Sequence, residues 1–441
     1  MSRPTGFADL AGRRVGIFGY GVEGRAAEAR LRDVAATLVI VDDQDLGEGV
    51  LVTDQGGFAA LATCDVVLKS PGIPRRRDDV VELERRGVVV TSALNLWLEG
   101  ADRARVIAVT GTKGKSTTTA LIEFLFRSLG QRALRLGNFG APPYDPSVDT
   151  ATGWLVLEVS SFQSVDLSSA PAYVVVTSLG EDHLDWHGTL EQYHRDKLAV
   201  TRATGSHVTI LADTPALRGA SQEIGGDPLW VSEVDNELAR RLGLLGSHNA
   251  TNVALAVNTV ARASGLTTGE VRASALAHAS DFVPLPGRLS LVREVRAASG
   301  DYRFVDDGLA TAPLPTLAAL EAFHDTPLAL IAGGFDRGVD YRELAHALNT
   351  RGPETHVVVM GPAGGRLDGL LDDSRRAGAA GDMREALEMA VTMLTAGGVV
   401  LLSPAAPSFD RYRNWEERSR DFARAVDVVA DAWSLGGDSN S

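Results

Sequence analysis

The sequence predicts three consecutive open, mostly parallel α/β domains, and three observations support this fold class. The chain has 441 residues, which is more than a single hydrophobic core usually serves. Short β-branched segments alternate with longer helical segments along most of the chain, as in parallel sheets. Glycine-rich loops follow two of the expected strands and precede helices, as at the ligand-binding edges of such sheets. We expect the domains to cover residues 1–104, 105–282 and 283–441.

The composition excludes several classes of protein. Lys and Arg number 43 against 57 Asp and Glu, a net charge of -14, whereas a nucleic-acid partner would require a basic face. The single cysteine, Cys64, cannot form an internal disulfide and suits a reducing compartment. No apolar run approaches the length of a membrane span. We therefore expect a cytoplasmic enzyme that binds neither nucleic acid nor membrane.

The first expected domain has a Rossmann-like pattern. A strand at 14–18 is followed by Gly19-Tyr20-Gly21-Val22-Glu23-Gly24, and a second strand at 37–41 ends in Asp42. The order and spacing resemble a dinucleotide site, in which the acid meets a ribose. Alone, this pattern favours an oxidoreductase, although the same glycines suit any diphosphate at a helix N-terminus.

A third strand, at 65–69, runs into Ser70, at the strand end where open α/β sheets bind ligands. Three arginines follow at 75–77, and we expect them to form a solvated face.

The second expected domain contains a phosphate loop. A buried strand at 106–110 leads into Gly111-Thr112-Lys113-Gly114-Lys115-Ser116-Thr117 and then a helix. Lys115 would neutralise phosphate oxygens and the Ser116 hydroxyl would bind Mg²⁺. Val109 occupies the position of the first glycine in the strict pattern, so the loop is a shortened one.

Downstream strands of this domain carry further candidates. Glu158 follows an apolar strand and is placed to hold a nucleotide-bound Mg²⁺, although an acid at a helix N-terminus is the simpler alternative. Two His and several acids gather at 181–188, a density typical of metal sites. On sequence alone, Lys197 is best explained as a solvated helix lysine. Asn249 and Asn252 share a helix face and could present amides to a purine or cap the helix.

The third expected domain is another Rossmann-like α/β unit that follows a rigid linker, Pro284–Arg288. Its strands, at 302–305, 328–331, 356–360 and 399–402, each end in polar or glycine-rich sequence, so we expect a ligand crevice along that edge. We expect the small polar tail after Gly436 to be disordered.

Taken together and in order, these motifs resemble the Mur ligases, ATP-dependent amide-forming enzymes of peptidoglycan precursor synthesis. Among these, the chain is most similar to the enzymes that add glutamate to UDP-N-acetylmuramoyl-L-alanine. The motifs span essentially the whole chain: Gly19-x-Gly-x-x-Gly24, Ser70-Pro-Gly-Ile73, Gly111-Thr-x-Gly-Lys-Ser-Thr117, Gly137-Asn-x-Gly140, Glu158-x-Ser-Ser-Phe-Gln163, Asp182-His-Leu-Asp185, Tyr193-x-x-x-Lys197, His248-Asn-x-x-Asn252, Arg288, Gly333-Gly334 and Ser403-Pro404.

The resemblance implies a role for each site residue. The catalytic centre would comprise Lys115, His183 and Lys197. The ATP site would comprise Gly111, Thr112, Lys113, Gly114, Lys115, Ser116, Thr117, Asn249, Asn252, Arg288 and Asp307. The UDP-sugar site would comprise Val22, Glu23, Asp42, Ser70, Asn138 and His183. The ligands of two Mg²⁺ ions would be Ser116, Glu158, His183 and Lys197, the last carbamylated by CO₂. This role replaces the interpretation of Lys197 as a solvated helix lysine.

The implied reaction starts when the alanyl carboxylate attacks the ATP γ-phosphate, giving an acyl phosphate and ADP. The amine of glutamate then displaces phosphate. The resemblance further implies closure by the third domain and a monomeric enzyme whose partners are UDP-N-acetylmuramoyl-L-alanine and glutamate.

The chain departs from the usual D-glutamate enzymes in the expected amino-acid pocket. The D-glutamate enzymes carry a segment of the type Asp-Ser-Lys-Ala-Thr. The matching segment here, residues 307–311, lacks the lysine and ends in Thr311. In the D-glutamate enzymes a lysine faces the substrate carboxylate, and the matching residue here is Arg337. Unlike lysine, an arginine can form a bidentate pair with a carboxylate. Near the C-terminus an Ala-Ser pair is here Pro407-Ser408, and the usual aromatic residue a few positions on is Trp415.

These changes resemble a divergent branch that adds L-glutamate and is coupled to a separate epimerase, and this is the function we expect. Four alternatives stay open: a D-glutamate ligase with a drifted pocket, a folylpolyglutamate-type ligase, a non-catalytic nucleotide-binding regulator and a dehydrogenase.

Overall fold

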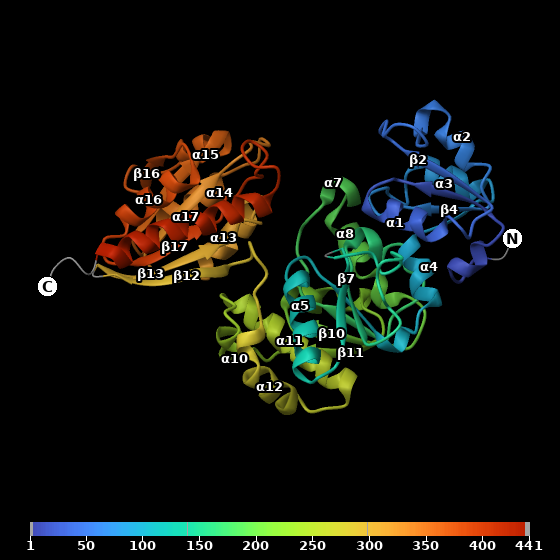
Figure 1. The fold of residues 1–441 in the computed structure, drawn as a ribbon, viewed down its shortest axis with the longest axis horizontal. Coiled ribbons are helices and arrows are strands. Elements are labelled where there is room, and N and C mark those ends of the chain that lie inside the picture. The colour runs from blue at the N-terminus through green and yellow to red at the C-terminus, as the bar shows by residue number, and fades with distance from the viewer. Residues whose placement is uncertain (1–2, 139, 298, 437–441) are drawn as a thin grey trace. The chain divides into compact units, whose positions relative to one another are not determined.

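The computed structural model describes residues 3–138, 140–297 and 299–436. The chain packs into two compact units (Figure 1). One comprises Met1–Asp235 with Thr251–His278, and the other comprises Asn236–Ala250 with Ala279–Ser441. The first unit contains two sheets and the second unit contains one.

The first sheet is wholly parallel, with strand order β3-β2-β1-β4-β5. The order reverses between β1 and β4, so a ligand crevice is expected at the loops after these two strands, at the carboxyl edge. Its strands are β1 (Arg14–Phe18), β2 (Thr37–Asp42), β3 (Leu51–Val52), β4 (Val66–Lys69) and β5 (Val89–Thr91). The helices of this region are α1 (Val22–Leu31), α2 (Gly57–Leu61), α3 (Asp78–Arg85) and α4 (Ala93–Gly100).

The second sheet is also parallel, with order β11-β10-β9-β6-β8-β7. Its central strand β6 is entirely buried, because β8 and β9 flank it and helices cover it. The strands are β6 (Val106–Thr110), β7 (Ala133–Gly137), β8 (Trp154–Glu158), β9 (Tyr173–Val176), β10 (Val208–Ala212) and β11 (Asp227–Val231). The helices are α5 (Lys115–Ser128), α6 (Ser161–Ser164), α7 (Leu184–His187), α8 (Leu190–Lys197), α9 (Pro215–Gly219), α11 (Ser247–Ser264), whose first turn belongs to the second unit, and α12 (Thr268–Ala277).

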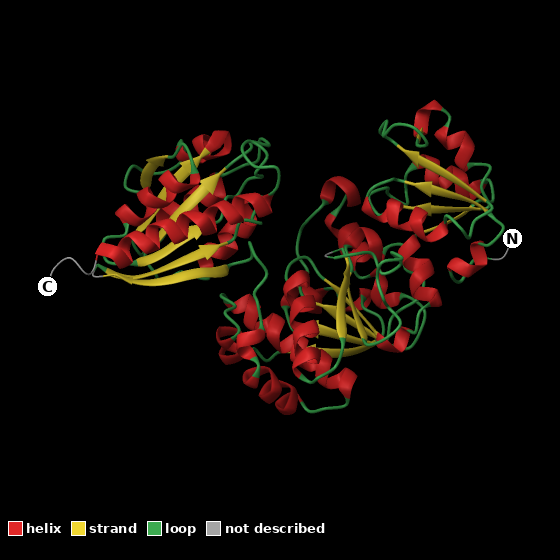
Figure 2. Ribbon diagram, viewed as in Figure 1, coloured by secondary structure: helices red, strands yellow, loops and turns green. Residues whose placement is uncertain are grey.

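The third sheet has order β12-β13-β17-β14-β15-β16 and is parallel except for the β12–β13 hairpin at its edge. Helices lie on both of its faces (Figure 2). Its strands are β12 (Ser290–Ala297), β13 (Gly300–Asp306), β14 (Leu328–Gly333), β15 (Thr355–Met360), β16 (Arg376–Ala379) and β17 (Gly398–Leu402). The helices of the second unit are α10 (Asn236–Arg241), α13 (Pro313–Glu321), α14 (Arg342–Thr350), α15 (Gly361–Asp368), α16 (Met383–Met393) and α17 (Trp415–Gly436).

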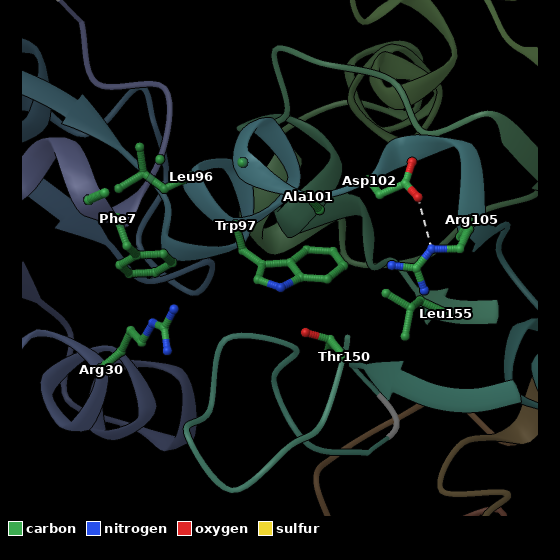
Figure 3. A pocket seen from close by; sticks show the side chains of 12 residues that line it. Phe7, Arg30, Leu96, Trp97, Ala101, Asp102, Arg105, Thr150 and Leu155 are labelled. Atoms are coloured by element: carbon green, nitrogen blue, oxygen red, sulfur yellow. Dashed lines mark hydrogen bonds and ion pairs between the residues drawn. The ribbon is translucent and has the colours of Figure 1, made fainter. Parts of the chain in front are cut away.

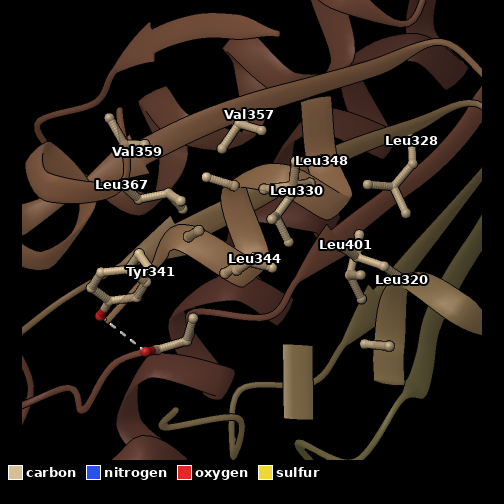
Figure 4. Packing of buried hydrophobic residues seen from close by; sticks show 14 of the residues in the cluster. Leu320, Leu328, Leu330, Tyr341, Leu344, Leu348, Val357, Val359, Leu367 and Leu401 are labelled. Carbon is tan, nitrogen blue, oxygen red and sulfur yellow. Dashed lines mark hydrogen bonds between the residues drawn. The ribbon is translucent and has the colours of Figure 1, made fainter. Parts of the chain in front are cut away.

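Two apolar clusters hold the third sheet between its helices. On one face Leu330 and Val357 pack with Leu344 and Leu348 of α14 (Figure 4). On the other face, strand residues such as Ile331 pack on α16 and α17. Strand residues therefore alternate between two buried faces, which explains why these strands read as continuous apolar runs.

The predicted fold class is confirmed by the three mostly parallel sheets, and every strand named from the sequence is present. The three domain ranges stay a prediction. The strands that the sequence analysis did not name, β3, β5, β7, β10, β11, β12 and β16, include the edge strands of all three sheets. The tail after residue 436 lies outside the described residues. Within the described ranges, no helix is both long enough and apolar enough to cross a membrane.

Candidate functional site

The phosphate loop lies between β6 and α5, and its glycines are required by their surroundings. Gly111 has φ 135°, and a Cβ there would lie 2.1 Å from Oγ1 of Thr177. Gly114 has φ 86°, and a Cβ there would lie 2.5 Å from Oδ1 of Asn252. An L side chain at either position would meet both backbone strain and a clash. The close approach also places Asn252 of α11 directly against the loop.

Both loop lysines bind neighbouring groups. Lys115 donates from Nζ to the carbonyl oxygens of Gly111 at 2.9 Å and Thr112 at 3.2 Å. Lys113 is more exposed and pairs with Asp182 at 3.3 Å. The pKa of Asp182 is lowered, because Lys113 and its neighbours outweigh the raising effect of burial. The loop therefore presents two cations beside the start of α5, an arrangement suited to phosphates.

Thr112 joins the loop to the segments that follow β9. Its Oγ1 accepts hydrogen bonds from the backbone N–H of Gly180 at 2.9 Å and from the Tyr193 hydroxyl at 3.1 Å. Ser116 and Thr117, the next polar residues of the motif, are buried at the start of α5.

Glu158, the last residue of β8, is buried with one carboxylate oxygen satisfied and the other not. Oε1 accepts from Nδ2 of Asn138 at 2.8 Å. Oε2 is buried and has no hydrogen-bond partner among the described residues. A buried carboxylate oxygen without a hydrogen-bond partner is costly, so Oε2 is a candidate to bind a ligand.

Lys197, the last residue of α8, is not the solvated helix lysine that the sequence alone favours. It is 2% exposed, and its Nζ donates to the Gly111 carbonyl at 3.0 Å and lies 4.8 Å from the centre of the Tyr193 ring. Burial, and then the charge of Lys115, hold its pKa well below the ordinary value. The expectation failed because the helix packs this face inward, which helical spacing alone does not reveal.

His183 lies outside this buried cluster. It has a left-handed backbone at φ 50°, its side chain is half exposed, and its Nε2 lies 3.8 Å from Oδ1 of Asp182. Across the described residues, no group of three or more His, Cys, Asp or Glu is arranged to hold a metal. The side chain of Asp185 lies outside the description.

The carboxyl edge of the first sheet brings Ser70 and Asp42 to the glycine loop. Ser70 donates from Oγ to the Gly19 carbonyl at 2.6 Å, and Oδ2 of Asp42 accepts from the backbone N–H of Tyr20 at 2.7 Å. Val22, at the start of α1, is 73% exposed. These residues surround the crevice expected for a diphosphate.

Glu23 of α1 reaches residues in two connections of the second sheet, the β7–β8 loop and α6. Its carboxylate accepts from Nε2 of Gln163 at 2.6 Å and from the Tyr144 hydroxyl at 3.0 Å. Burial raises the pKa of Glu23, although both hydrogen bonds oppose the shift. This side chain therefore holds the first sheet's glycine-loop helix to the loop after Glu158.

The arginine run 75–77 is not merely a solvated face, because each guanidinium forms an ion pair. Two of the three reach residues that flank the second sheet. The pairs are Arg75 with Glu84 and Asp166, Arg76 with Asp196, and Arg77 with Asp43 and Asp79.

In the second unit, Asp307 follows β13 and is buried. Its Oδ2 accepts from Ser403 Oγ at 2.7 Å. Burial raises the pKa of Asp307 to about 7, with Asp306 adding to the effect and Arg288 opposing it. Asn249 lies in the first turn of α11 and donates from Nδ2 to the Leu245 carbonyl at 2.6 Å. This bond is not the N-cap interaction considered from sequence, in which the side-chain oxygen would accept from a backbone N–H.

The expected amino-acid residues lie on the strand-end loops of the second unit. Arg337 is exposed, with its guanidinium carbon 6.0 Å from the centre of the Phe409 ring. Thr311 is exposed, Ser408 is buried, and Trp415 begins α17.

Sequence reasoning missed Arg418, which binds these strand-end loops together. It is 3% exposed and donates to the carbonyls of Gly308 at 2.9 Å and Ala406 at 3.0 Å. Burial lowers its pKa to about 10. A helix arginine is ordinarily solvated, so no sequence signal distinguishes it.

A cavity of about 400 Å³ lies elsewhere in the first unit and contains none of the expected site residues. Trp97 lies in its middle between Phe7 on one side and Arg105 on the other, and Arg105 pairs with Asp102 (Figure 3). The candidate site is therefore at the strand-end loops and not in this cavity.

Comparison with known proteins gives one family. Residues 109–228 match the sequence profile of the Mur ligase middle domain. Over 95% of the chain, the sequence is 38% identical to the UDP-N-acetylmuramoyl-L-alanine--L-glutamate ligase of a Micromonospora species, covering 97% of that protein. The enzyme of the same name from Salinispora tropica is 39% identical over 95% of this chain and 98% of its own length.

Solved structures share the fold at lower identity. The MurF ligase of Thermotoga maritima in complex with ADP superposes with a TM-score of 0.56 at 16% identity, covering 97% of this chain and 98% of that one. The UDP-N-acetylmuramate-alanine ligase MurC of Thermotoga maritima gives a TM-score of 0.53 at 19% identity, with 95% and 100% covered.

Proposed function

Because this chain belongs to the Mur ligase family of ATP-dependent, amide-forming ligases, we propose that it joins L-glutamate to UDP-N-acetylmuramoyl-L-alanine, forming ADP and phosphate. Two relatives named UDP-N-acetylmuramoyl-L-alanine--L-glutamate ligase match over 97% and 98% of their own length, which supports the proposal. The observation that carries it is the phosphate loop, whose Lys115 lies with the buried Glu158 and Lys197 at one edge of the second sheet. The dehydrogenase interpretation of the first glycine loop is not retained.

The proposed chemistry begins with attack of the alanyl carboxylate on the γ-phosphorus of ATP, which breaks the bond to ADP and yields an acyl phosphate. Lys115 and the N–H groups at the start of α5 stabilise charge on the transferring group. The amine of glutamate then attacks the acyl carbon, loses a proton and displaces phosphate.

In the first unit, the proposed ATP-binding residues are loop residues 111–117 and Asn252. For Asn249, Arg288 and Asp307, which belong to the second unit, the ATP-binding role rests on the family resemblance. The proposed UDP-sugar site comprises Val22, Glu23, Asp42, Ser70, Asn138 and His183.

The residues at the phosphate loop fit Mg²⁺. This hard cation takes oxygen ligands, and Oε2 of Glu158 is a buried oxygen without a hydrogen-bond partner among the described residues. Ser116, at the start of α5, would supply a hydroxyl beside the phosphates. We propose two Mg²⁺ ions, with His183 and a carbamate on Lys197 completing the ligands. When bound, Mg²⁺ would neutralise charge on the phosphates.

Carbamylation of Lys197 is supported by its surroundings. Only an uncharged amine attacks CO₂, and the pKa of Lys197 is held well below its ordinary value by burial and by Lys115. In this step the nitrogen lone pair forms an N–C bond to CO₂ and one proton leaves to solvent. The product is a carbamate, an anionic group that presents two oxygens in place of the amine.

Carbamylation can be tested directly, because the chain contains only four lysines: Lys69, Lys113, Lys115 and Lys197. In ¹³C-bicarbonate, we expect one lysine carbamate resonance by NMR. Lys197→Arg should remove it, because a guanidinium does not carbamylate, whereas Lys113→Arg should keep it. A carbamate resonance that persists in Lys197→Arg contradicts the assignment.

The substrate proposal is tested by phosphate release from ATP with UDP-N-acetylmuramoyl-L-alanine and either enantiomer of glutamate. We expect turnover at least about 100-fold faster with L-glutamate than with D-glutamate. A bidentate pair with the Arg337 guanidinium fixes the position of the substrate carboxylate, so only one enantiomer would place its amine correctly. Faster turnover with D-glutamate would favour the alternative, a D-glutamate ligase with an unusual pocket. Equal rates would contradict selectivity for either enantiomer. An L-glutamate product also calls for a separate enzyme that inverts the new residue wherever the D-form is needed.

A further inference from the structure

A chain of side-chain contacts runs from the first sheet to the loop after Glu158. Arg76 donates from both Nη1 and Nη2 to Oδ2 of Asp196, each at 3.2 Å. Nδ1 of His187 lies 2.7 Å from the same Oδ2, and Nε2 of His187 lies 3.0 Å from Oγ of Ser161. The sequence motifs did not single out Asp196, and His187 appeared only as part of the dense loop 181–188.

The contacts determine which way the hydrogen bonds point. The Asp196 carboxylate only accepts, so Nδ1 of His187 carries the proton and Nε2 accepts from the Ser161 hydroxyl. Burial lowers the pKa of His187, although Asp196 opposes the shift. The imidazole also stacks on Phe162, with ring centres 5.4 Å apart and planes 11° apart. Its orientation is thus held at both nitrogens and at one face.

This Ser–His–Asp arrangement is not a nucleophile with its base. Ser161 is 2% exposed and His187 is 3% exposed, so no substrate reaches the hydroxyl. The arrangement instead joins elements that carry the proposed chemistry. Ser161 begins α6, three residues after Glu158, and Asp196 precedes Lys197 in α8. Arg76 lies in the β4–α3 loop that begins at Ser70.

We propose that His187 is a positioning residue: with Asp196 and Arg76 it sets the alignment of Glu158 and Lys197, and so couples the sugar-binding edge of the first sheet to phosphoryl transfer. This inference rests on the proposed function. According to this inference, replacing Arg76 changes the rate of phosphoryl transfer and not the affinity for ATP or the UDP-sugar. A misplacement of about 1 Å in a catalytic group lowers a rate by about 100-fold.

The test compares kcat and KM for ATP and the UDP-sugar, measured well below the melting temperature of every variant. His187→Phe keeps the ring stack but removes both hydrogen bonds, and we expect kcat about 100-fold lower with each KM within about 3-fold. Arg76→Met should lower kcat about 10-fold. Arg76→Lys should keep kcat within about 3-fold of the wild-type value. Both guanidinium nitrogens donate to the same oxygen, Oδ2 of Asp196, and a single ammonium group can also donate to it. The double variant should be no slower than His187→Phe alone, because both changes break the same chain.

Arg77→Met is the matched control. Arg77 lies in the same loop and forms two ion pairs, but with Asp43 and Asp79 and not with residues that flank the second sheet. It should leave kcat unchanged. Wild-type kcat in both His187→Phe and Arg76→Met, or an equal loss in Arg77→Met, overturns the inference. If His187→Phe does not fold, the inference is judged on the kcat of Arg76→Met, because Arg76 is half exposed and its replacement should not prevent folding. Absence of turnover in the unaltered protein would instead refute the proposed function.

Discussion

Replacing Lys197 with alanine is expected to lower kcat about 1,000-fold, the upper range for removing one group that stabilises transition-state charge. The reason is the loss of the proposed carbamate beside Gly111 and Tyr193, where Nζ of Lys197 lies. Acetate should restore part of the activity, because a free carboxylate can enter the space left by the side chain and supply the same oxygens. The measurement is ATP turnover against acetate concentration.

Lys197→Arg is the companion variant, because it keeps a positive charge but cannot carbamylate. We expect it to be as inactive as Lys197→Ala and not to respond to acetate, because the guanidinium fills the space. Acetate should leave the unaltered protein unchanged. Wild-type activity in Lys197→Arg would show that a cation suffices here and would refute the carbamate.

The second large effect is expected at Gly114, where Gly114→Ala should lower kcat/KM for ATP by about 100-fold. The new Cβ would lie 2.5 Å from Oδ1 of Asn252, so either the loop or Asn252 must move. A shift of about 1 Å in groups that position a reactant costs about this much.

Gly12→Ala separates the clash from the backbone strain. Gly12 also has positive φ, at 70°, but a Cβ there would have no atom of the described residues within 4 Å beyond its chain neighbours. Both substitutions incur about 1–2 kcal/mol of left-handed strain, measurable by denaturant unfolding, but only Gly114→Ala should impair ATP use. Adding Asn252→Ala to Gly114→Ala should not restore full activity, because Asn252 is itself in the proposed ATP site. Equal kcat/KM in Gly12→Ala and Gly114→Ala would contradict the steric argument.

The sequence analysis predicted much of the fold because central parallel strands are buried on both faces. Continuous apolar runs such as 106–110 and 399–402 therefore mark strands with little ambiguity. Edge strands are partly exposed, as β3, β12 and β16 are, so they lack the continuous apolar run of a central strand. The three domain ranges remain predictions. The two compact units divide the chain differently, with Asn236–Ala250 packed in the second unit.

The candidate site was predictable where a motif binds through its backbone. The phosphate loop is an example, because its glycines are required locally at Gly111 and Gly114. It was unpredictable where a side chain acts through distant partners. Lys197 and Arg418 occur in helices whose periodicity permits either face to be solvated, and only their burial at 2% and 3% exposure distinguishes them.

The sequence by itself determined the fold class, the phosphate loop and the family resemblance, because each depends on the local order of residues along the chain. Only the tertiary structure decided that Lys197 is buried and that Arg76 reaches His187 through Asp196. The physical reason is desolvation. The ionisation of a lysine and the orientation of an imidazole depend on which groups exclude water from them, and those groups come from segments as far apart as residues 76 and 196.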